Sequence, residues 1–127
     1  MKDLIAKLEA ATGPSRELDA EIDCAVRFPD LRPARPDDHK EHQRSYPPSA
    51  GYIWCPTGFL MASSYTSSID AALTLVPEGY GWNLQGNTNS FYAVVRGYKN
   101  KVSPTPAIAL CIAALRARET TLKGEER

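Results

Sequence analysis

The 127-residue sequence lacks an excess of charge of either sign, because fifteen Lys and Arg residues balance fifteen Asp and Glu residues. General nucleic-acid binding usually depends on a basic surface that neutralises phosphate groups. Here the first 26 residues are mildly acidic, and the later segments carry only a slight positive excess. We therefore expect a protein that does not bind nucleic acid in a general way.

The sequence also lacks a long hydrophobic run. Its longest apolar stretch, residues 106–115, is far shorter than the roughly 20 residues that cross a membrane. The chain starts without the charged and apolar segments of a secretory signal, and its cysteines are odd in number, namely Cys24, Cys55 and Cys111. These features predict reduced thiols and a cytoplasmic protein without a membrane partner.

Common catalytic signatures are absent: the sequence has no glycine-rich phosphate loop and no HExxH, GxSxG or CxxC pattern. The segment PDDHKEHQ does gather possible metal ligands, which are Asp37, Asp38, His39, Glu41 and His42. Metal ligands are normally held on rigid elements, whereas this segment is proline-rich, so a solvated polar loop is the favoured interpretation. We expect no catalytic residues, no metal and no cofactor. A small enzyme that uses these acids and histidines is an alternative.

Periodic apolar residues predict helices near the start of the chain, within a single domain over residues 1–127. The first helix has one apolar face and stops at Gly13 and Pro14. That face consists of Leu4, Ile5, Leu8 and Ala11. Ser15 is the expected N-cap of a second helix. The inner face of this second helix consists of Leu18, Ile22, Ala25 and Val26.

Two hairpins are predicted in the middle of the chain. GYIWCPTGFLMAS reads as two strands around the turn Pro56-Thr57-Gly58, and YGWNLQGNTNSFYAVVRGY reads as an alternating strand, a turn and a return strand. The return strand, residues 91–98, is apolar on both faces, which is typical of a strand inside a sheet. Residues 28–48 alternate prolines with charges and are predicted to form a polar loop.

The last predicted helix begins at Thr105 as N-cap and Pro106 in the first turn, and residues 120–127 are expected to fray. Its buried stripe consists of Ile108, Cys111, Ile112 and Leu115. Together the segments predict an α+β fold. We expect an α-β-α sandwich, in which about four antiparallel strands form one sheet with helices on both faces.

A run of hydroxyl groups, SSYTSSIDAAL, precedes another apolar pattern at residues 69–76. Ser67 as N-cap and Asp70 three residues later fit a capping box, and capping is the favoured interpretation. The remaining hydroxyl groups are unexplained by capping, and a helix start can also hold an anion. On that alternative an arginine would pair with the phosphate. The candidate ligand-binding residues are Ser64, Tyr65, Thr66, Ser67, Ser68, Thr105, Arg16 and Arg96.

Four segments in combination resemble a known family. They are Tyr65-x-x-Ser68-Ile69-Asp70-Ala71-Ala72, the strand GWNL, the aromatic-rich return strand, and TPAIALCIAALRAR. Together they resemble the phage ABA sandwich domain of small phage and prophage proteins, and the close of the chain is similar to NinX-type phage accessory proteins. The resemblance covers most of residues 15–118 outside the proline-rich loop. It implies an α-β-α sandwich and transfers no catalytic residues.

The leading hypothesis is a phage-encoded accessory protein that acts in the bacterial host cell and sequesters a nucleotide-like immune signal, an anti-defence role. The alternative is a protein-interaction module whose proline-rich loop and aromatic edge dock onto a host or phage protein, or a domain without a ligand; self-association is compatible with each. A pocket lined by Arg16 or Arg96 beside a hydroxyl-rich helix start would favour the first hypothesis. A flat apolar patch would favour the second.

Overall fold

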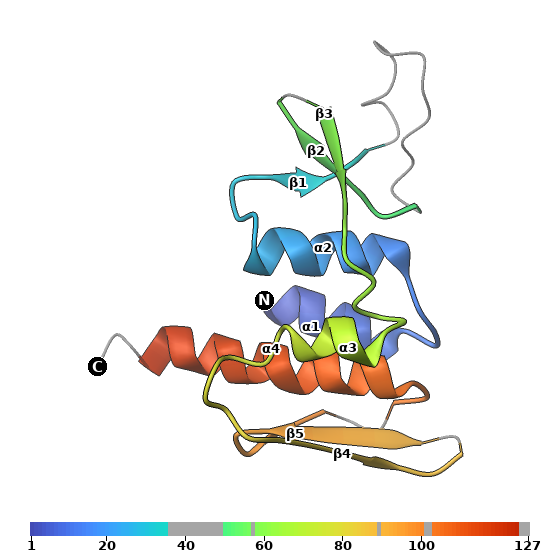
Figure 1. The fold of residues 1–127 in the computed structure, drawn as a ribbon, viewed down its shortest axis with the longest axis vertical. Helices are drawn as coiled ribbons and strands as arrows, with labels where there is room; N and C mark the ends of the chain where they lie inside the picture. Colours follow the sequence, from blue (N-terminus) through green and yellow to red (C-terminus); the bar gives the residue numbers. More distant parts are fainter. Residues whose placement is uncertain (36–49, 57, 89, 101–102, 125–127) are drawn as a thin grey trace. The chain divides into compact units, whose positions relative to one another are not determined.

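The structure, a computed structural model, describes residues 1–35, 50–56, 58–88, 90–100 and 103–124 (Figure 1). These residues form two compact units. Unit 1 joins residues 1–14 to the part of the chain that starts at Tyr65, and unit 2 spans residues 15–64. The candidate metal ligands at residues 37–42 lie outside the described residues. One domain over residues 1–127 stays a prediction.

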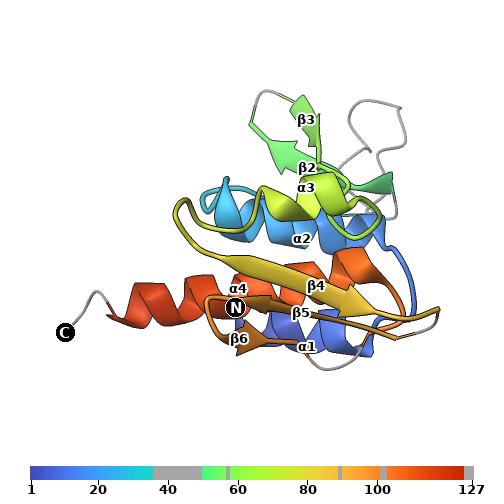
Figure 2. The same cartoon turned by 60° about the horizontal axis from the view of Figure 1, so that its bottom comes forward.

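Unit 1 is layered around one long helix. Its elements are α1 (Lys2–Ala10), α3 (Ile69–Leu73), β4 (Trp82–Gly86), β5 (Phe91–Val95), β6 (Tyr98–Lys99) and α4 (Pro106–Gly124). The three strands form an antiparallel sheet in the order β4-β5-β6, and Figure 2 shows them side by side. Helix α4 contacts this sheet as well as α1 and α3. In Figure 1 it lies between the sheet and these two helices.

The central position of α4 explains its burial. Thr105 caps the helix as predicted, because its hydroxyl oxygen accepts a hydrogen bond from the Ile108 N–H at 3.2 Å. The predicted stripe is buried, but one stripe was too narrow a prediction: each residue from 107 to 115 is at most 3% exposed. A helix packed on two sides is apolar all round. Its backbone remains helical to Gly124, beyond residue 120 where fraying was expected.

Strand β5 is the middle strand of its sheet, as its apolar sequence predicted. Side chains alternate between the two faces of a strand, and Ala93 and Val95 are buried on the face that α4 covers. Tyr92 points to the opposite face and is 40% exposed. The turn to β6 is Arg96-Gly97, with φ values of 48° and 87°. Two successive positive φ values are those of a type I′ hairpin turn, which matches the twist of the strands.

Unit 2 packs one helix on a second small sheet. Its elements are α2 (Arg16–Val26), β1 (Arg32–Pro33), β2 (Tyr52–Cys55) and β3 (Gly58–Met61). The predicted hairpin is confirmed, since β2 and β3 are antiparallel and Cys55 pairs with Gly58. Helix α2 contacts β1 and β2. The core of this unit is apolar and small, consisting of Ala20, Cys24, Ile53 and Ala62 with Phe28 and Leu31 packed against it.

The α+β class is confirmed, but the strands do not form one sheet. The described residues form two three-stranded antiparallel sheets, in the orders β1-β2-β3 and β4-β5-β6. The first hairpin pairs with β1, in which Pro33 is opposite Ile53, and the second hairpin pairs with β6. The prediction missed β1 because it consists of only two residues inside a proline-rich stretch. The sandwich with one sheet covered on both faces is therefore not confirmed.

The start of the predicted polar loop is part of the fold. Phe28 and Leu31 pack on the core of unit 2, and Ala34 is buried. The Ala34 N–H donates to the Tyr52 carbonyl at 2.9 Å, which extends the pairing of β1 with β2. Residues 36–48 of that prediction lie outside the described residues.

The predictions for the two N-terminal helices are correct in part. Leu4, Ile5 and Leu8 of α1 are buried, as expected. In α2, Ser15 is the N-cap, because its hydroxyl accepts from the Leu18 N–H at 3.2 Å. The predicted inner face is only half correct: Leu18 and Ile22 are buried, whereas Ala25 is exposed and Val26 is partly exposed. Two acidic residues, Asp19 and Asp23, are buried instead.

Candidate functional site

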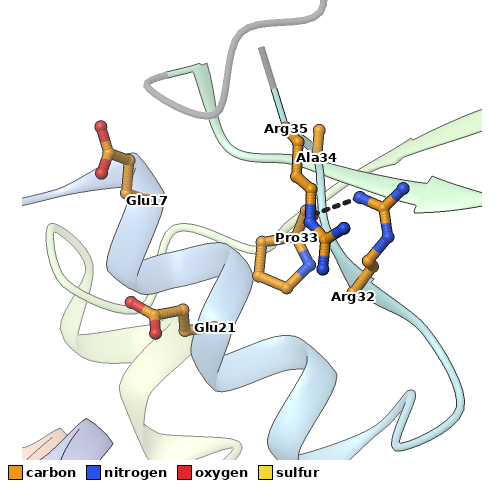
Figure 3. Close-up of a pocket in the computed structure, with 6 residues that line it drawn as sticks. All are labelled: Glu17, Glu21, Arg32, Pro33, Ala34 and Arg35. Carbon is orange, nitrogen blue, oxygen red and sulfur yellow. Dashed lines mark hydrogen bonds between the residues drawn. The ribbon is translucent and has the colours of Figure 1, made fainter. Parts of the chain in front are cut away.

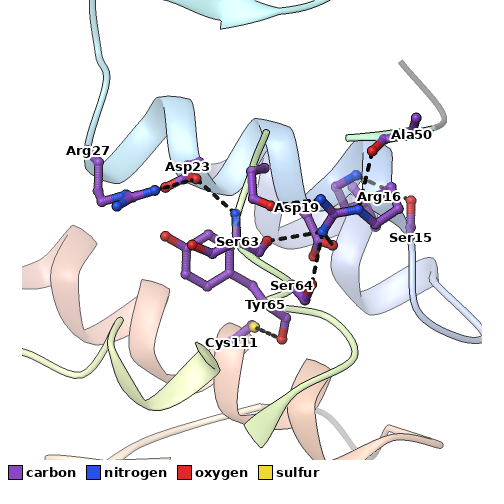
Figure 4. A network of polar contacts seen from close by, with 12 residues as sticks. Ser15, Arg16, Asp19, Asp23, Arg27, Ala50, Ser63, Ser64, Tyr65 and Cys111 are labelled. Carbon is purple, nitrogen blue, oxygen red and sulfur yellow. Dashed lines mark hydrogen bonds and ion pairs between the residues drawn. The ribbon is translucent and has the colours of Figure 1, made fainter. Parts of the chain in front are cut away.

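Arg16, a candidate phosphate ligand, is occupied by contacts inside unit 2 (Figure 4). Its guanidinium donates to the Asp19 carboxylate at 2.7 Å and to the Ala62 carbonyl at 2.7 Å. It also donates to the Ser64 hydroxyl at 3.2 Å, so the structure does bring two of the candidate residues together. Longer bonds of 3.4 Å reach the carbonyl groups of Ala50 and Ser63. Arg16 therefore ties the start of α2 to both ends of the β2–β3 hairpin.

Asp23 makes the second polar tie within unit 2. Its carboxylate accepts from Arg27 Nε at 2.5 Å, from Arg27 Nη2 at 2.8 Å and from the Ser63 N–H at 3.1 Å. Asp23 is fully buried, and a buried carboxylate is tolerated only when it is paired and hydrogen-bonded. Sequence reasoning missed this pair, although an Asp followed four residues later by an Arg is a recognisable helical pairing signal.

The buried carboxylate also affects a neighbouring thiol. Burial, together with the negative charges of Asp23 and Glu21, raises the pKa of the Cys24 thiol from 9.0 to about 11. A thiol reacts as its thiolate, so Cys24 is suited to packing and not to nucleophilic chemistry. Cys111 also packs as predicted: it is fully buried, and its thiol donates to the Tyr65 carbonyl within unit 1.

The hydroxyl run begins helix α3, but the cap lies one residue later than predicted. The Ser68 hydroxyl accepts from the Ala71 N–H at 3.2 Å, which makes Ser68 the N-cap in place of Ser67. The capping box with Asp70 is therefore wrong, since Asp70 follows this cap by two residues and not by three. Tyr65 and Thr66 are buried at 2% and 0% exposure. Both are therefore packed side chains and do not form an exposed ligand surface.

Arg96 and Thr105 both make contacts within unit 1 that stabilise the fold. The Arg96 guanidinium lies over the Tyr80 ring at 4.5 Å from its centre, which is a cation–π geometry. Thr105 is engaged as the cap of α4. Of the eight candidate residues, Arg16 and Ser64 contact each other, Ser68 and Thr105 cap helices, and Tyr65 and Thr66 are buried.

One pocket in unit 2 has a volume of about 260 Å³ and lies beside β1. It is lined by Glu17, Glu21, Arg32, Pro33, Ala34 and Arg35. Figure 3 shows the two glutamates on α2 and the two arginines on the segment around β1. Arg32 also lies over the ring of Trp54, at 4.8 Å from its centre. Carboxylates and guanidinium groups share this pocket, so its charge does not select a phosphate group.

Metal binding and membrane crossing can be assessed for the described part of the chain. In that part, no group of three or more His, Cys, Asp or Glu side chains is placed to hold a metal ion. No described helix combines the length and the apolar character that crossing a membrane requires.

Strand β4 lies at the edge of its sheet and presents main-chain groups that face away from β5. Arg96 N–H donates to Gly81 O at 3.0 Å, and Asn87 N–H donates to Ser90 O at 3.0 Å. In an antiparallel ladder, residues that exchange hydrogen bonds with the neighbouring strand alternate with residues that do not. The main-chain groups of Asn83 and Gln85 therefore point to β5. The main-chain groups of the alternate residues point away from β5, and these residues are Trp82, Leu84 and Gly86.

The side chains of this edge are uncharged, and Trp82 and Leu84 are its large apolar residues. Trp82 is 50% exposed and is the largest exposed hydrophobic residue of the described chain. The strand sequence WNLQG contains no charged residue and no proline, which are the usual protection of an open edge. Strand β3 of unit 2 also exposes Leu60 and Met61, but it lacks an exposed tryptophan. Among the described residues, β4 is the edge strand with an exposed tryptophan.

Comparison with known proteins found no match for this chain among models of protein families, curated proteins or solved structures. The resemblance to the phage ABA sandwich domain and to NinX-type proteins stays a prediction. The described residues define a small α+β fold in which the edge strand β4 exposes a tryptophan.

Proposed function

We propose that this protein is a protein-interaction module that binds an extended segment of a partner along strand β4. Adding a strand to a sheet edge uses main-chain hydrogen bonds for affinity and side-chain pockets for specificity. The observation that carries the proposal is the outward direction of the main-chain groups of Trp82, Leu84 and Gly86, next to a half-exposed indole. Tryptophan is among the residues most enriched in interface hot spots.

The nucleotide-sequestering anti-defence function has less support. It depended on Arg16 or Arg96 meeting a phosphate beside a hydroxyl-rich helix start. Arg16 instead donates to a carboxylate and to three main-chain carbonyls, and Arg96 lies over Tyr80. Calorimetric titration with cyclic nucleotides tests that hypothesis directly. A phage origin and a cytoplasmic place of action in a bacterial host likewise stay predictions.

The test of the proposal is selection of binders from a random peptide library with the purified protein. Selected peptides should bind the unmodified protein and should not bind the Leu84→Lys variant. A lysine at the centre of the edge places a charge beside the bound peptide and disfavours an apolar peptide strand. Tyr92→Lys is the matched control: Tyr92 is exposed on the middle strand, so this variant should keep binding. Peptides that bind both lysine variants equally well would place the interaction elsewhere.

A further inference from the structure

We propose that β4 binds β4 of a second copy of this chain, in an antiparallel pair with the two Leu84 residues opposite each other. This inference rests on the proposed function, since it names the partner of the same edge. The pair would join two sheets into one of six strands, in the order β6-β5-β4-β4-β5-β6.

The hydrogen-bonding groups of β4 match this register. Trp82, Leu84 and Gly86 direct their main-chain groups outward and are spaced symmetrically about Leu84. A twofold axis at Leu84 places Trp82 of one copy opposite Gly86 of the other. Each of these pairs then exchanges two main-chain hydrogen bonds, as in the close pairs of an antiparallel ladder. A shift by one residue would instead oppose outward groups with groups already used by β5.

The side chains fit the same register. A tryptophan opposite a glycine avoids a clash between two large groups, and no like charges meet along the uncharged strand. A glycine is required at position 86 within one copy as well, because the Phe91 ring lies so close that a Cβ at Gly86 would overlap it. In the pair, the indole of Trp82 from the second copy would lie beside this Phe91 ring.

The helices leave room for the pair. Antiparallel strands related by this axis keep both α4 helices on one face of the joined sheet. Helix α4 contacts β5 more extensively than β4, and three strand spacings separate the two β5 strands, which is about 14 Å. Packed helices need about 8–10 Å between their axes, so the two α4 helices do not collide. The space between them would hold Trp82 and Leu84 of both copies, which are side chains on this face.

Cysteine cross-linking tests the register, in a background with Cys55→Ser because Cys55 is partly exposed. Leu84→Cys should form a disulfide between two copies under mild oxidation, since close antiparallel pairs have Cα atoms about 5.5 Å apart. Asn83→Cys alone should not, because residue 83 meets residue 85 of the other copy. A dimer that cross-links through Asn83→Cys and not through Leu84→Cys would overturn the proposed pairing.

Sedimentation velocity provides the second measurement. The unmodified chain should sediment as a dimer at micromolar concentration, whereas Trp82→Lys and Leu84→Lys should sediment as monomers with an unchanged circular dichroism spectrum. Tyr92→Lys should remain a dimer. An unmodified chain that is monomeric throughout would overturn self-pairing. If that monomer still binds library peptides through β4, the interaction function stands; if it binds none, both proposals fail.

Discussion

The guanidinium group of Arg16 lies against the backbone of Gly51, where a Cβ atom would come within 2.7 Å of Nε. Gly51 has a φ of 84°, a conformation that side chains other than glycine rarely adopt. A glycine thus allows the chain to turn at this point and leaves space for the arginine. This relationship explains how one side chain reaches carbonyl groups at both ends of the hairpin.

The first prediction follows from this contact. Gly51→Ala should lower the free energy of unfolding by about 1–3 kcal/mol, because it strains the backbone and displaces Arg16 from its hydrogen bonds. Chemical denaturation measures the change. Gly13→Ala is the matched control, since no atom lies within 4 Å of a Cβ at that position. Equal effects of the two substitutions would show that the Arg16 contact contributes nothing.

The second prediction concerns alkaline pH. Because the pKa of Cys24 is raised to about 11, the folded state keeps this thiol protonated at pH values where the unfolded chain, with a pKa of 9.0, has lost the proton. The protonated Cys24 thiol should therefore make its full contribution to the free energy of unfolding below pH 9.0. This contribution should be lost as the pH rises towards 11. Thermal melts across this range measure the fall.

Cys24→Ala tests the source of that pH dependence. The variant lacks the titrating group, so its stability should fall less steeply over the same range. An identical slope in both proteins would assign the dependence to other groups.

The third prediction concerns the start of α3. Ser68→Ala should lower the free energy of unfolding by about 0.5–2 kcal/mol, since it removes the hydroxyl that accepts from the Ala71 N–H. Ser67→Ala, at the position expected from the sequence, should have a smaller effect. If denaturation experiments showed a larger loss of stability for Ser67→Ala than for Ser68→Ala, Ser67 would be the N-cap.

The fourth prediction concerns the centre of unit 1. Leu115→Ala should cost about 2–5 kcal/mol, because Leu115 is fully buried and its truncation leaves a cavity. Leu60→Ala makes the same chemical change at a residue that is 40% exposed, and it should cost much less. A melting temperature that barely changes in Leu115→Ala would place the α4 side chain outside the core.

The fold could be predicted where its signals are local. Ser15 and Thr105 cap the helices that follow them, and the Pro56-containing turn joins the strands that flank it. Each of these features depends on residues within a few positions of one another. The choice between Ser67 and Ser68 failed even so, because both hydroxyls precede the same apolar pattern and only the direction of the backbone distinguishes them.

The sequence by itself determined the caps of α2 and α4, the hairpins and the apolar character of α4, since backbone geometry and side-chain periodicity are local properties. Only the tertiary structure decided which strands share a sheet, where Arg16 donates its hydrogen bonds, and that β4 lies at the edge of its sheet. These features join residues far apart in the chain, such as Arg16 and Ala62. Periodicity indicates that a residue is buried or exposed, but the partner depends on how separate elements pack.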